Sequence, residues 1–397
     1  MSKRSRSDNF PARRQKTDSS ALGYADHSTK ATSSSPRLKV HPYSRYEQGP
    51  AVLRKPMFLG DFSLDEQRRF CHDQRNLSFI HMDWTGDKKV QFDLNVAMDK
   101  VIRKNGEETK NEKLDRMLEW ILSNTAKFHT KESAGKSLQC LSTDFVCFRG
   151  LLTQLMCTPY ENREGWIVCA TRFRNTIYLC AYETPERKAQ REGETEMQKT
   201  MCSWGYKFEQ YMIDGSNTSE GVNENEEYCV MMRSRLHDHS LVYGAEVDGA
   251  DPALYKTPHG DLGAFVELKT SKEVTSEREH RTLHKFKMMK WWGQSHLVGI
   301  PRVVCGFRDT SGIINTLRTY HVQEIPKLSQ DYWKSDNMLK FLRYFLDFVK
   351  RSVLMDDPQC IYKFERFPGG DITCTYLGHD PKWAFLPEWY YKKVFNS

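Results

Sequence analysis

The hydrophobic pattern of the chain changes character near residue 142. Upstream, in NEKLDRMLEWIL, the apolar residues recur three and four positions apart, which predicts an amphipathic helix over 111–122; they are Leu114, Met117, Leu118, Ile121 and Leu122. Downstream, short apolar runs separated by polar residues and glycines predict a series of strands: FVCFRG, GWIVCATRFRNTIYLCAYE, YCVMMRSRL, SLVYGAEVDG, GAFVELKT and RVVCGFRD. Because many strands follow one another with few helices between them, we expect an α+β fold with mixed or antiparallel sheets.

Two of these segments carry clear signals at their ends. The runs ATRF and TIYLCAY are separated by Arg174 and Asn175, a spacing that predicts a β-hairpin. After the strand GAFVELKT, Ser276 precedes Glu279 by three residues, the arrangement of a capping box. We therefore expect a helix from about residue 277 to 296.

Residues 1–40 differ in composition from the rest of the chain. They are rich in Ser, Thr, Lys and Arg and poor in large apolar residues, so burial cannot offset the entropy lost on ordering them. We expect a disordered basic tail over 1–40 and a single domain over 41–397, where no second linker and no internal repeat is found. The clusters KRSR and RRQK in the tail are spaced like a bipartite import signal, which predicts a nuclear location; non-specific affinity for nucleic acid is the alternative role.

The net charge of +7 is concentrated in this tail. Residues 1–40 hold nine Lys or Arg and three Asp, whereas the remaining residues hold 50 basic and 49 acidic side chains. A nucleic-acid site in the body must therefore be a local patch and not a global field.

Composition also excludes several classes of protein. Aromatic residues make up 12% of the chain, which argues against wholesale disorder. No stretch approaches 18 uninterrupted apolar residues and no apolar run follows the basic N-terminus, so neither a membrane span nor a secretory signal is expected. The 11 cysteines include no CxxC pair, which favours a reducing compartment over a disulfide framework and argues against structural zinc. His237 and His239 fit a polar loop better than a metal site.

Three segments place acids in apolar surroundings. Glu209 lies within WGYKFEQYM, Glu246 and Asp248 lie two apart in GAEVDG, and Glu267 and Lys269 lie two apart in FVELK. Residues two apart on a strand share one face, so Glu246 and Asp248 repel each other unless a cation lies between them. Taken alone, the first pair fits a solvated face and the second fits an ion pair.

Taken together, the acids predict a metal site. Carboxylate oxygens suit Mg²⁺, and four acids can hold two ions about 3.5–4 Å apart, the arrangement that cleaves phosphodiesters. Lys269 beside them would stay protonated, which favours an electrostatic role over that of a general base.

The order GYKFE, EVD, VELKTSK and KWWGQS closely resembles the decapping exoribonuclease (DXO) family, in a vertebrate-type form. The resemblance covers nearly all of residues 55–390, with FRG at 148–150 upstream and GFRD, DDP and AFLPEWY downstream. It implies two mixed β-sheets flanked by helices, with a deep active-site pocket in a catalytic domain over 41–397. It also implies that Mg²⁺ (two per site, with Mn²⁺ as a substitute) is bound by Glu209, Glu246, Asp248, Glu267 and the Leu268 carbonyl.

The remaining site residues follow from the same resemblance. Lys269 and Gln294 would hold the scissile phosphate and its attacking water, while Arg149, Phe148 and Gly150 would bind RNA phosphates. Arg68, Glu112 and Cys229 occupy further substrate-binding positions. Without the resemblance, Arg149 fits a structural ion pair, Cys229 a small core residue, and the pair Trp291 and Trp292 a core position. Lys287, Trp291 and Gln294 are expected on one helix face.

The implied function is a metal-dependent hydrolase of RNA 5′ ends. It would remove incomplete or NAD caps and degrade RNA in the 5′ to 3′ direction, acting on single-stranded ends that are capped or 5′-monophosphorylated, with no membrane and no protein partner required. Three alternatives remain at this point: a restriction-enzyme-like DNA nuclease, a non-catalytic module that binds RNA ends, and a scaffold whose acids form structural ion pairs.

Overall fold

The computed structural model describes residues 35–49, 51–81, 83, 86–104, 106, 112–128, 140–256 and 262–394. The chain from Ser35 onward forms one compact unit. The predicted disorder of residues 1–34 and the two basic clusters lie outside the described residues.

Runs of two or three consecutive strands, separated by helices, make up most of the described chain. The strands are β1 (Arg37–Leu38), β2 (Met57–Leu64), β3 (Phe70–Cys71), β4 (Lys88–Asp93), β5 (Phe145–Phe148), β6 (Trp166–Phe173), β7 (Thr176–Tyr182), β8 (Glu227–Leu236), β9 (His239–Glu246), β10 (Gly249–Ala250), β11 (Phe265–Lys272), β12 (Arg302–Arg308), β13 (Ile313–His321), β14 (Asp357–Arg366) and β15 (Ile372–Gly378). The helices are α2 (Asp115–Ser123), α3 (Arg149–Cys157), α4 (Pro185–Glu192), α5 (Glu196–Met212), α6 (Glu277–Thr282), α7 (Met288–Val298), α8 (Ile325–Leu328), α9 (Ser335–Ser352) and α10 (Glu388–Tyr391). Short helical turns are η1 (Tyr43–Arg45), η3 (Met98–Lys100), η4 (Thr125–Phe128), η5 (Leu262–Ala264) and η6 (Leu283–Lys287).

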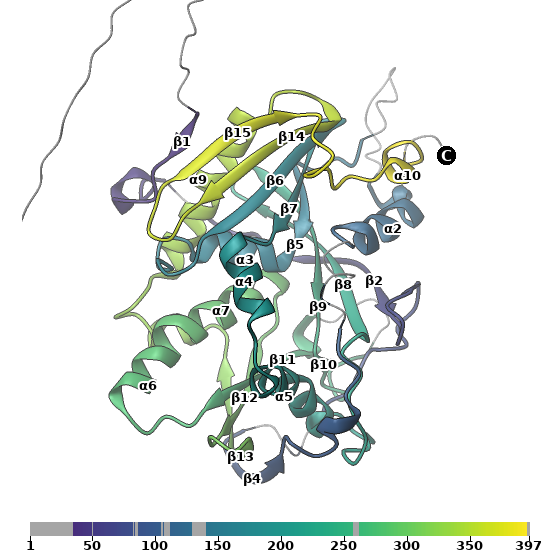
Figure 1. Cartoon of the computed structure of the whole chain (residues 1–397), viewed down its shortest axis with the longest axis vertical. Helices are drawn as coiled ribbons and strands as arrows, with labels where there is room; N and C mark the ends of the chain where they lie inside the picture. The colour runs from purple at the N-terminus through teal and green to yellow at the C-terminus, as the bar shows by residue number, and fades with distance from the viewer. Residues whose placement is uncertain are drawn as a thin grey trace, which may run out of the picture. The chain divides into compact units, whose positions relative to one another are not determined.

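The strands form two mixed sheets (Figure 1). The larger sheet has the order β1-β15-β14-β6-β7-β5-β9-β8-β2-β3, and the smaller has the order β10-β11-β12-β13-β4. In the larger sheet β5 runs parallel to β7 and β9, and in the smaller sheet β11 runs parallel to β12, whereas the other pairs are antiparallel. The predicted α+β class with two mixed sheets is thus confirmed.

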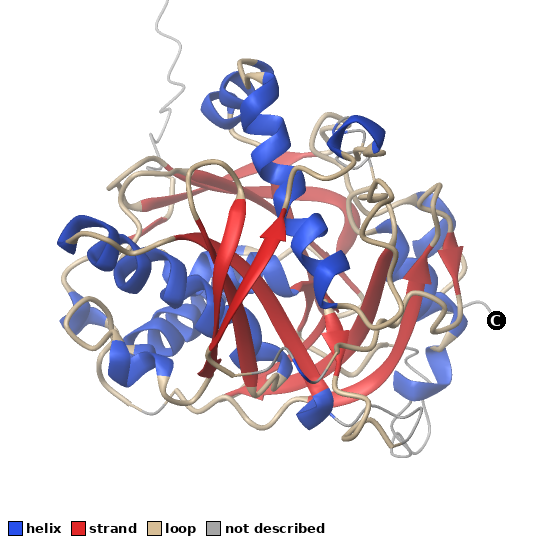
Figure 2. Ribbon diagram, turned by 90° about the horizontal axis from the view of Figure 1, so that it is seen from below, coloured by secondary structure: helices blue, strands red, loops and turns tan. Residues whose placement is uncertain are grey.

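The larger sheet is covered by apolar side chains on both faces. Along β5, Phe145 and Cys147 belong to one core and Val146 to another, as the two-residue period of a strand requires. Helices α3, α7 and α9 cover the first face, and α2 with the segment around α10 covers the second. Figure 2 shows helices on both sides of the strands. Burial of both faces explains why these strands read as continuous apolar runs and not as alternating ones.

The smaller sheet is divided in the same way. Val266 and Leu268 of β11 pack with Phe208 of α5, while Phe265 faces the principal core. Glu267 and Lys269 share the face of Phe265, so this side of β11 turns from apolar to charged along its length. The placement of both charged residues on one face of a strand is as predicted.

The predicted helices and hairpin are present, with shifted ends. The helix expected over 111–122 runs from Asp115 to Ser123, and the one expected over 277–296 is α6, a π-helical turn η6 and α7 in succession. The Ser276 side chain accepts the backbone N–H of Glu279, as a capping residue does. β6 and β7 form the hairpin, and both Arg174 and Asn175 have positive φ, as a tight two-residue turn requires.

Three details depart from the sequence analysis. Residues 35–40, placed there in the disordered tail, include β1, because Leu38 and Val40 are buried. FVCFRG is a strand only to Phe148, since Arg149 already begins α3. SLVYGAEVDG likewise leaves the strand after Glu246, so Asp248 lies in the connection to β10 and not on β9.

No helix in the described part of the chain is long and apolar enough to cross a bilayer. All eleven cysteines are free thiols, in agreement with the lack of paired spacing in the sequence.

Candidate active site

The site is built around the charged end of β11. The Lys269 ammonium lies 2.6 Å from Glu267 Oε1 and 3.4 Å from Asp248 Oδ2. Glu267 is 1% exposed. Burial alone would raise the pKa of Glu267, but Lys269 and Arg149 together hold that pKa below its ordinary value. For the same reason the two carboxylates raise the pKa of Lys269 despite its burial, so this side chain stays an ammonium.

Arg149 joins the two sheets at this point. It is the first residue of α3, directly after β5 of the larger sheet, and its Nη1 lies 3.2 Å from Glu267 Oε2 in the smaller sheet. Its Nε is buried and has no hydrogen-bond partner among the described residues. The predicted ion pair of Arg149 is therefore present, but it uses only part of the donor capacity of the guanidinium.

Asp248 is held by the backbone of β11. Its Oδ2 accepts the Leu268 N–H at 2.6 Å as well as the Lys269 ammonium. Burial still raises the pKa of Asp248, and Glu267 adds to this effect. Leu268 itself packs toward α5, so its contribution to the site comes from its backbone.

Glu246 and Glu209 complete the acids, from the end of β9 and the last turn of α5. Burial, followed by repulsion from Glu227, raises the pKa of Glu246 to about 7. Burial and repulsion from Asp248 and Glu246 raise the pKa of Glu209 well above its ordinary value. We name Glu209, Glu246 and Asp248 the carboxylate cluster.

This cluster fits a divalent cation in its chemistry. Three carboxyl groups with raised pKa values lie in one cavity of about 620 Å³, which also contains Glu66, Glu220, Glu226 and Glu227. Hard oxygen ligands in such a set suit Mg²⁺, Mn²⁺ or Ca²⁺, and a bound cation would remove the repulsion that raises these pKa values. Their oxygen atoms are not gathered within 4.8 Å of one another, so these acids would have to move closer to share one ion.

The predicted phosphate-binding residues lie on the other side of Arg149. Gly150 of α3 and Gln294 of α7 line a second cavity of about 560 Å³, together with Lys290 and Arg187. α3 begins at this cavity, and its N-cap residue Phe148 supplies no side-chain hydrogen bond to the first backbone N–H groups. The structure thus brings Phe148, Arg149, Gly150 and Gln294 to one region, but it does not bring Gln294 into the cavity of the carboxylate cluster.

The helix around Gln294 also corrects one detail. Lys287 ends the π-helical turn and donates to Ser271 Oγ at 3.1 Å, so it contacts the end of β11 and not the Gln294 cavity. Trp291 and Trp292 are 5% and 4% exposed and belong to the core, as the alternative interpretation proposed.

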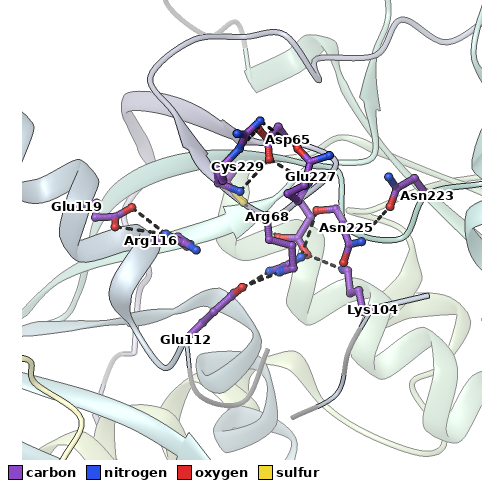
Figure 3. Close-up of polar contacts among 12 residues, drawn as sticks. Asp65, Arg68, Lys104, Glu112, Arg116, Glu119, Asn223, Asn225, Glu227 and Cys229 are labelled. Atoms are coloured by element: carbon purple, nitrogen blue, oxygen red, sulfur yellow. Dashed lines mark hydrogen bonds and ion pairs between the residues drawn. The ribbon is translucent and has the colours of Figure 1, made fainter. Parts of the chain in front are cut away.

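Arg68, Glu112 and Cys229, also predicted, lie in a network of charged side chains (Figure 3). The Arg68 guanidinium binds both oxygens of Glu112, at 2.8 and 2.9 Å, and reaches Glu227 Oε1 at 2.9 Å. Lys104 also pairs with Glu227. We name Arg68, Lys104, Glu112 and Glu227 the paired cluster.

The paired cluster adjoins the carboxylate cluster through β8 and β9. Cys229 on β8 stands opposite Glu246 on β9 in the antiparallel register, and Glu227 lies two residues away on the same strand. Burial would raise the pKa of Glu227, but Lys104 and Arg68 lower it below its ordinary value. Cys229 is buried, which raises the pKa of its thiol, so it is a neutral side chain beside two acids.

The sequence analysis did not identify Glu227 and Lys104. Glu227 precedes Cys229 by two residues on a strand, so the two-residue period could have placed both on one face. Lys104 follows no comparable pattern.

Comparison with known proteins agrees with this geometry. Residues 54–391 match the family model described as RAI1 like PD-(D/E)XK nuclease. The human protein named decapping and exoribonuclease protein is 35% identical over 374 residues, covering 92% of each chain. The Drosophila melanogaster protein named decapping and exoribonuclease protein Rai1 is 33% identical, covering 86% of this chain and 91% of its own.

Solved structures share the fold. Candida albicans Rai1 in complex with pU5-Mn²⁺ superposes with a TM-score of 0.76 at 19% identity, covering 91% of this chain and 98% of its own. Scheffersomyces stipitis Rai1 in complex with (3′-NADP)⁺ and calcium ion gives a TM-score of 0.75 at 19% identity. At this identity the likeness confirms the fold and leaves the roles of individual residues open.

Proposed function

Because the chain belongs to the RAI1-like PD-(D/E)XK nuclease family, we propose that it is a metal-dependent hydrolase of RNA 5′ ends. It removes incomplete or NAD caps and then degrades the RNA in the 5′ to 3′ direction. Relatives named decapping and exoribonuclease protein at 33–37% identity support this assignment.

The observation that carries the proposal is the charged end of β11. An acid and a lysine two residues apart share one face of a buried strand, and the carboxylate of Asp248 contacts the same lysine. In the carboxylate cluster beside them only Asp248 has an ion pair, with Lys269, and Glu209 and Glu246 form none with a described residue, whereas a scaffold would have paired each acid. This distribution of charge favours a hydrolytic site over structural ion pairs.

We propose Mg²⁺ as the metal, two ions per site, with Mn²⁺ as a substitute. Glu209, Glu246, Asp248, Glu267 and the Leu268 carbonyl would hold the ions. When bound, such ions polarise the scissile phosphate and lower the pKa of a water molecule. Asp248 can offer Oδ1 to an ion while Oδ2 keeps its bonds with Lys269 and the Leu268 N–H.

The cations of the site act on the phosphate. The Lys269 ammonium, with its raised pKa, cannot accept a proton, so it stabilises negative charge that develops on the phosphorus oxygens. The unpaired Nε of Arg149 and the first backbone N–H groups of α3, which have no side-chain cap, offer donors to the adjacent RNA phosphates beside Phe148 and Gly150. Gln294 both donates and accepts hydrogen bonds, which suits a phosphate with its water.

Both cavities contribute to substrate binding. The cavity with Gly150 is mixed in charge, because Lys290 and Arg187 line it beside Glu161, Glu164 and Glu183, so its cations offer local contacts to RNA phosphates. The acidic cavity beside Arg68, Glu112 and Cys229 suits the group at the 5′ end. A buried site requires single-stranded ends, either capped or 5′-monophosphorylated, and we propose that no protein partner is needed. The basic clusters of the tail support a nuclear location, which a fluorescent fusion of the full chain and of residues 41–397 would test.

The function is tested with RNAs labelled at the 3′ end and carrying a 5′-monophosphate or an NAD cap. We expect loss of the cap and shortening from the 5′ end with Mg²⁺, neither of which occurs with EDTA or in Glu246→Gln. Binding without turnover would instead indicate a non-catalytic module. Preferential cleavage of the matched DNA would indicate a DNA nuclease.

A further inference from the structure

A second set of metal-ligand side chains lies on β14 and directly after β15, outside the elements that carry the hydrolytic site. Asp357, Cys360 and His379 place one carboxylate oxygen, one sulfur and one ring nitrogen within 4.8 Å of one another. Asp357 Oδ2 lies 2.9 Å from His379 Nε2 and 3.4 Å from Cys360 Sγ. None of the three lines the cavities of the hydrolytic site.

The backbone builds this cluster through two irregularities. β14 pairs with β6 at Asp357 and again at Tyr362, but the partner residues, Arg172 and Ala170, are only two apart, so β14 carries a bulge between them. The bulge brings Cys360 back toward Asp357, with two residues between the two ligands. On the other side, β15 ends at Gly378, whose φ of 63° is a conformation that favours glycine, and the next residue is His379.

The spacing and the distances match a tetrahedral ion. Two intervening residues is the usual separation of paired ligands in structural zinc sites. A tetrahedral Zn²⁺ with ligands at about 2.0–2.3 Å needs ligand atoms roughly 3.3–3.8 Å apart, so the observed 2.9 and 3.4 Å require only a slight opening. The Tyr376 hydroxyl lies 3.5 Å from the sulfur, and the fourth position of such an ion would be taken by this hydroxyl or by water.

We propose that Asp357, Cys360 and His379 form a zinc site that is separate from the hydrolytic centre. A thiolate and an imidazole exclude Mg²⁺ and Ca²⁺, which prefer oxygen ligands, and select a softer ion such as Zn²⁺. The Asp carboxylate and the Cys thiolate together balance the charge of the ion. The sequence argued against structural zinc, because it contains no closely spaced pair of Cys or His ligands that would predict this site.

Its role follows from its position in the larger sheet. The cluster joins the residue after β15 to the start of β14, and the neighbouring Asp356 accepts the backbone N–H groups of Arg174 and Asn175 at the β6–β7 turn. A bound ion would thus connect the end of β15 to the start of β14, next to the β6–β7 turn. The chain would then have a structural site with Cys and His ligands in addition to a catalytic site with oxygen ligands.

The test uses the full-length chain, stripped with a chelator and titrated with Co²⁺ and Zn²⁺. We expect one tightly bound Zn²⁺ per chain in the presence of excess Mg²⁺, and a cobalt spectrum with thiolate-to-metal charge transfer. Cys360→Ser and His379→Ala should each weaken Zn²⁺ binding by at least about 100-fold, since loss of a mere supporting residue already costs 10- to 100-fold. His379 is 59% exposed, so its variant tests the site without a change in the core.

Two matched controls separate this site from others. Cys229→Ser removes the thiol beside the carboxylate cluster, and Cys202→Ser removes an exposed thiol; both should retain the cobalt band. Zn²⁺ should raise the thermal midpoint of the wild type and of both controls but not of His379→Ala, with unchanged RNA hydrolysis in His379→Ala at 25 °C. A zinc content of zero in the wild type, or one unaffected by His379→Ala and Cys360→Ser, would overturn the proposal.

Discussion

The carboxylate cluster and the paired cluster lie side by side, but the pKa values of their carboxyl groups are shifted in opposite directions. In the paired cluster, Arg68 and Lys104 lower the pKa of Glu227, so the chain supplies its own counter-charges. In the carboxylate cluster, burial and repulsion from neighbouring carboxylates, Glu227 and Glu267 among them, raise the pKa values of Glu209, Glu246 and Asp248. The contrast indicates that the first cluster holds structure, while the second depends on cations from solution.

The largest expected effect is the loss of hydrolysis in Glu246→Gln. Amide for carboxylate removes a predicted metal ligand, so single-turnover cleavage of 5′-monophosphate RNA should fall by at least about 1,000-fold. The free energy of unfolding in EDTA should be unchanged or higher, because one repulsive charge is removed.

Glu226→Gln is the matched control for this variant. Glu226 lines the same cavity but is exposed and is not a predicted ligand, so its activity should stay near that of the wild type. If Glu246→Gln instead lost several kcal/mol of stability, the two clusters would not differ as described.

In contrast to Glu246→Gln, Arg68→Ala is expected to lower the free energy of unfolding. This change leaves Glu112 and Glu227 partly buried with fewer counter-charges, and breaking a buried pair costs about 3–5 kcal/mol; with Lys104 still present we expect about 3 kcal/mol. Urea unfolding measures this loss. Arg69→Ala removes the neighbouring cation, which pairs with Asp65 but is 73% exposed, and should cost less than about 1 kcal/mol. Equal losses of unfolding free energy in the two variants would show that the paired cluster stabilises the fold no more than an exposed ion pair does.

Lys269→Ala tests the contact between cation and acids at β11. The ammonium should act mainly on charge that develops during the reaction, so the single-turnover rate should fall about 100-fold while RNA affinity in EDTA changes much less. Lys272→Ala, on the same strand and 52% exposed, should change neither quantity appreciably. A Lys269→Ala variant that loses affinity and rate in equal proportion would assign the residue to substrate binding alone.

The charged end of β11 could be predicted from the sequence, because it follows local periodicity, whereas the same period wrongly placed Asp248 on β9 with Glu246. Glu267 and Lys269 are two apart on a strand, so the two-residue period predicts that they share one face, and in the structure they do. The hairpin at Arg174 and Asn175 and the cap at Ser276 are equally local and are confirmed.

Features that depend on contacts between distant segments could not be predicted in this way. The bond from Arg149 to Glu267 joins two sheets across 118 residues, and the pairing of Lys104 with Glu227 spans 123. The zinc ligands require a bulge and a glycine turn on adjacent strands, neither of which has a periodic signature. The assignment of site roles therefore rested on motif resemblance, and those roles remain predictions for the experiments above.

The smallest expected effects are two opposite slopes of stability against pH, measured in EDTA. Glu246 has a pKa raised from 4.5 to about 7, so the folded state holds its proton more tightly and is favoured at low pH; this contribution is lost as pH rises from about 4.5 to 7. Glu227 has a lowered pKa, so its contribution is present above 4.5 and is lost as pH falls below that value. Urea unfolding between pH 3.5 and 7.5 should therefore show a decline near neutrality that Glu246→Gln reduces and an acid-side loss that Glu227→Gln reduces. Saturating Mg²⁺ should reverse the neutral decline only, because a cation favours the ionised carboxylates, and identical profiles in both variants would contradict the contrast between the clusters.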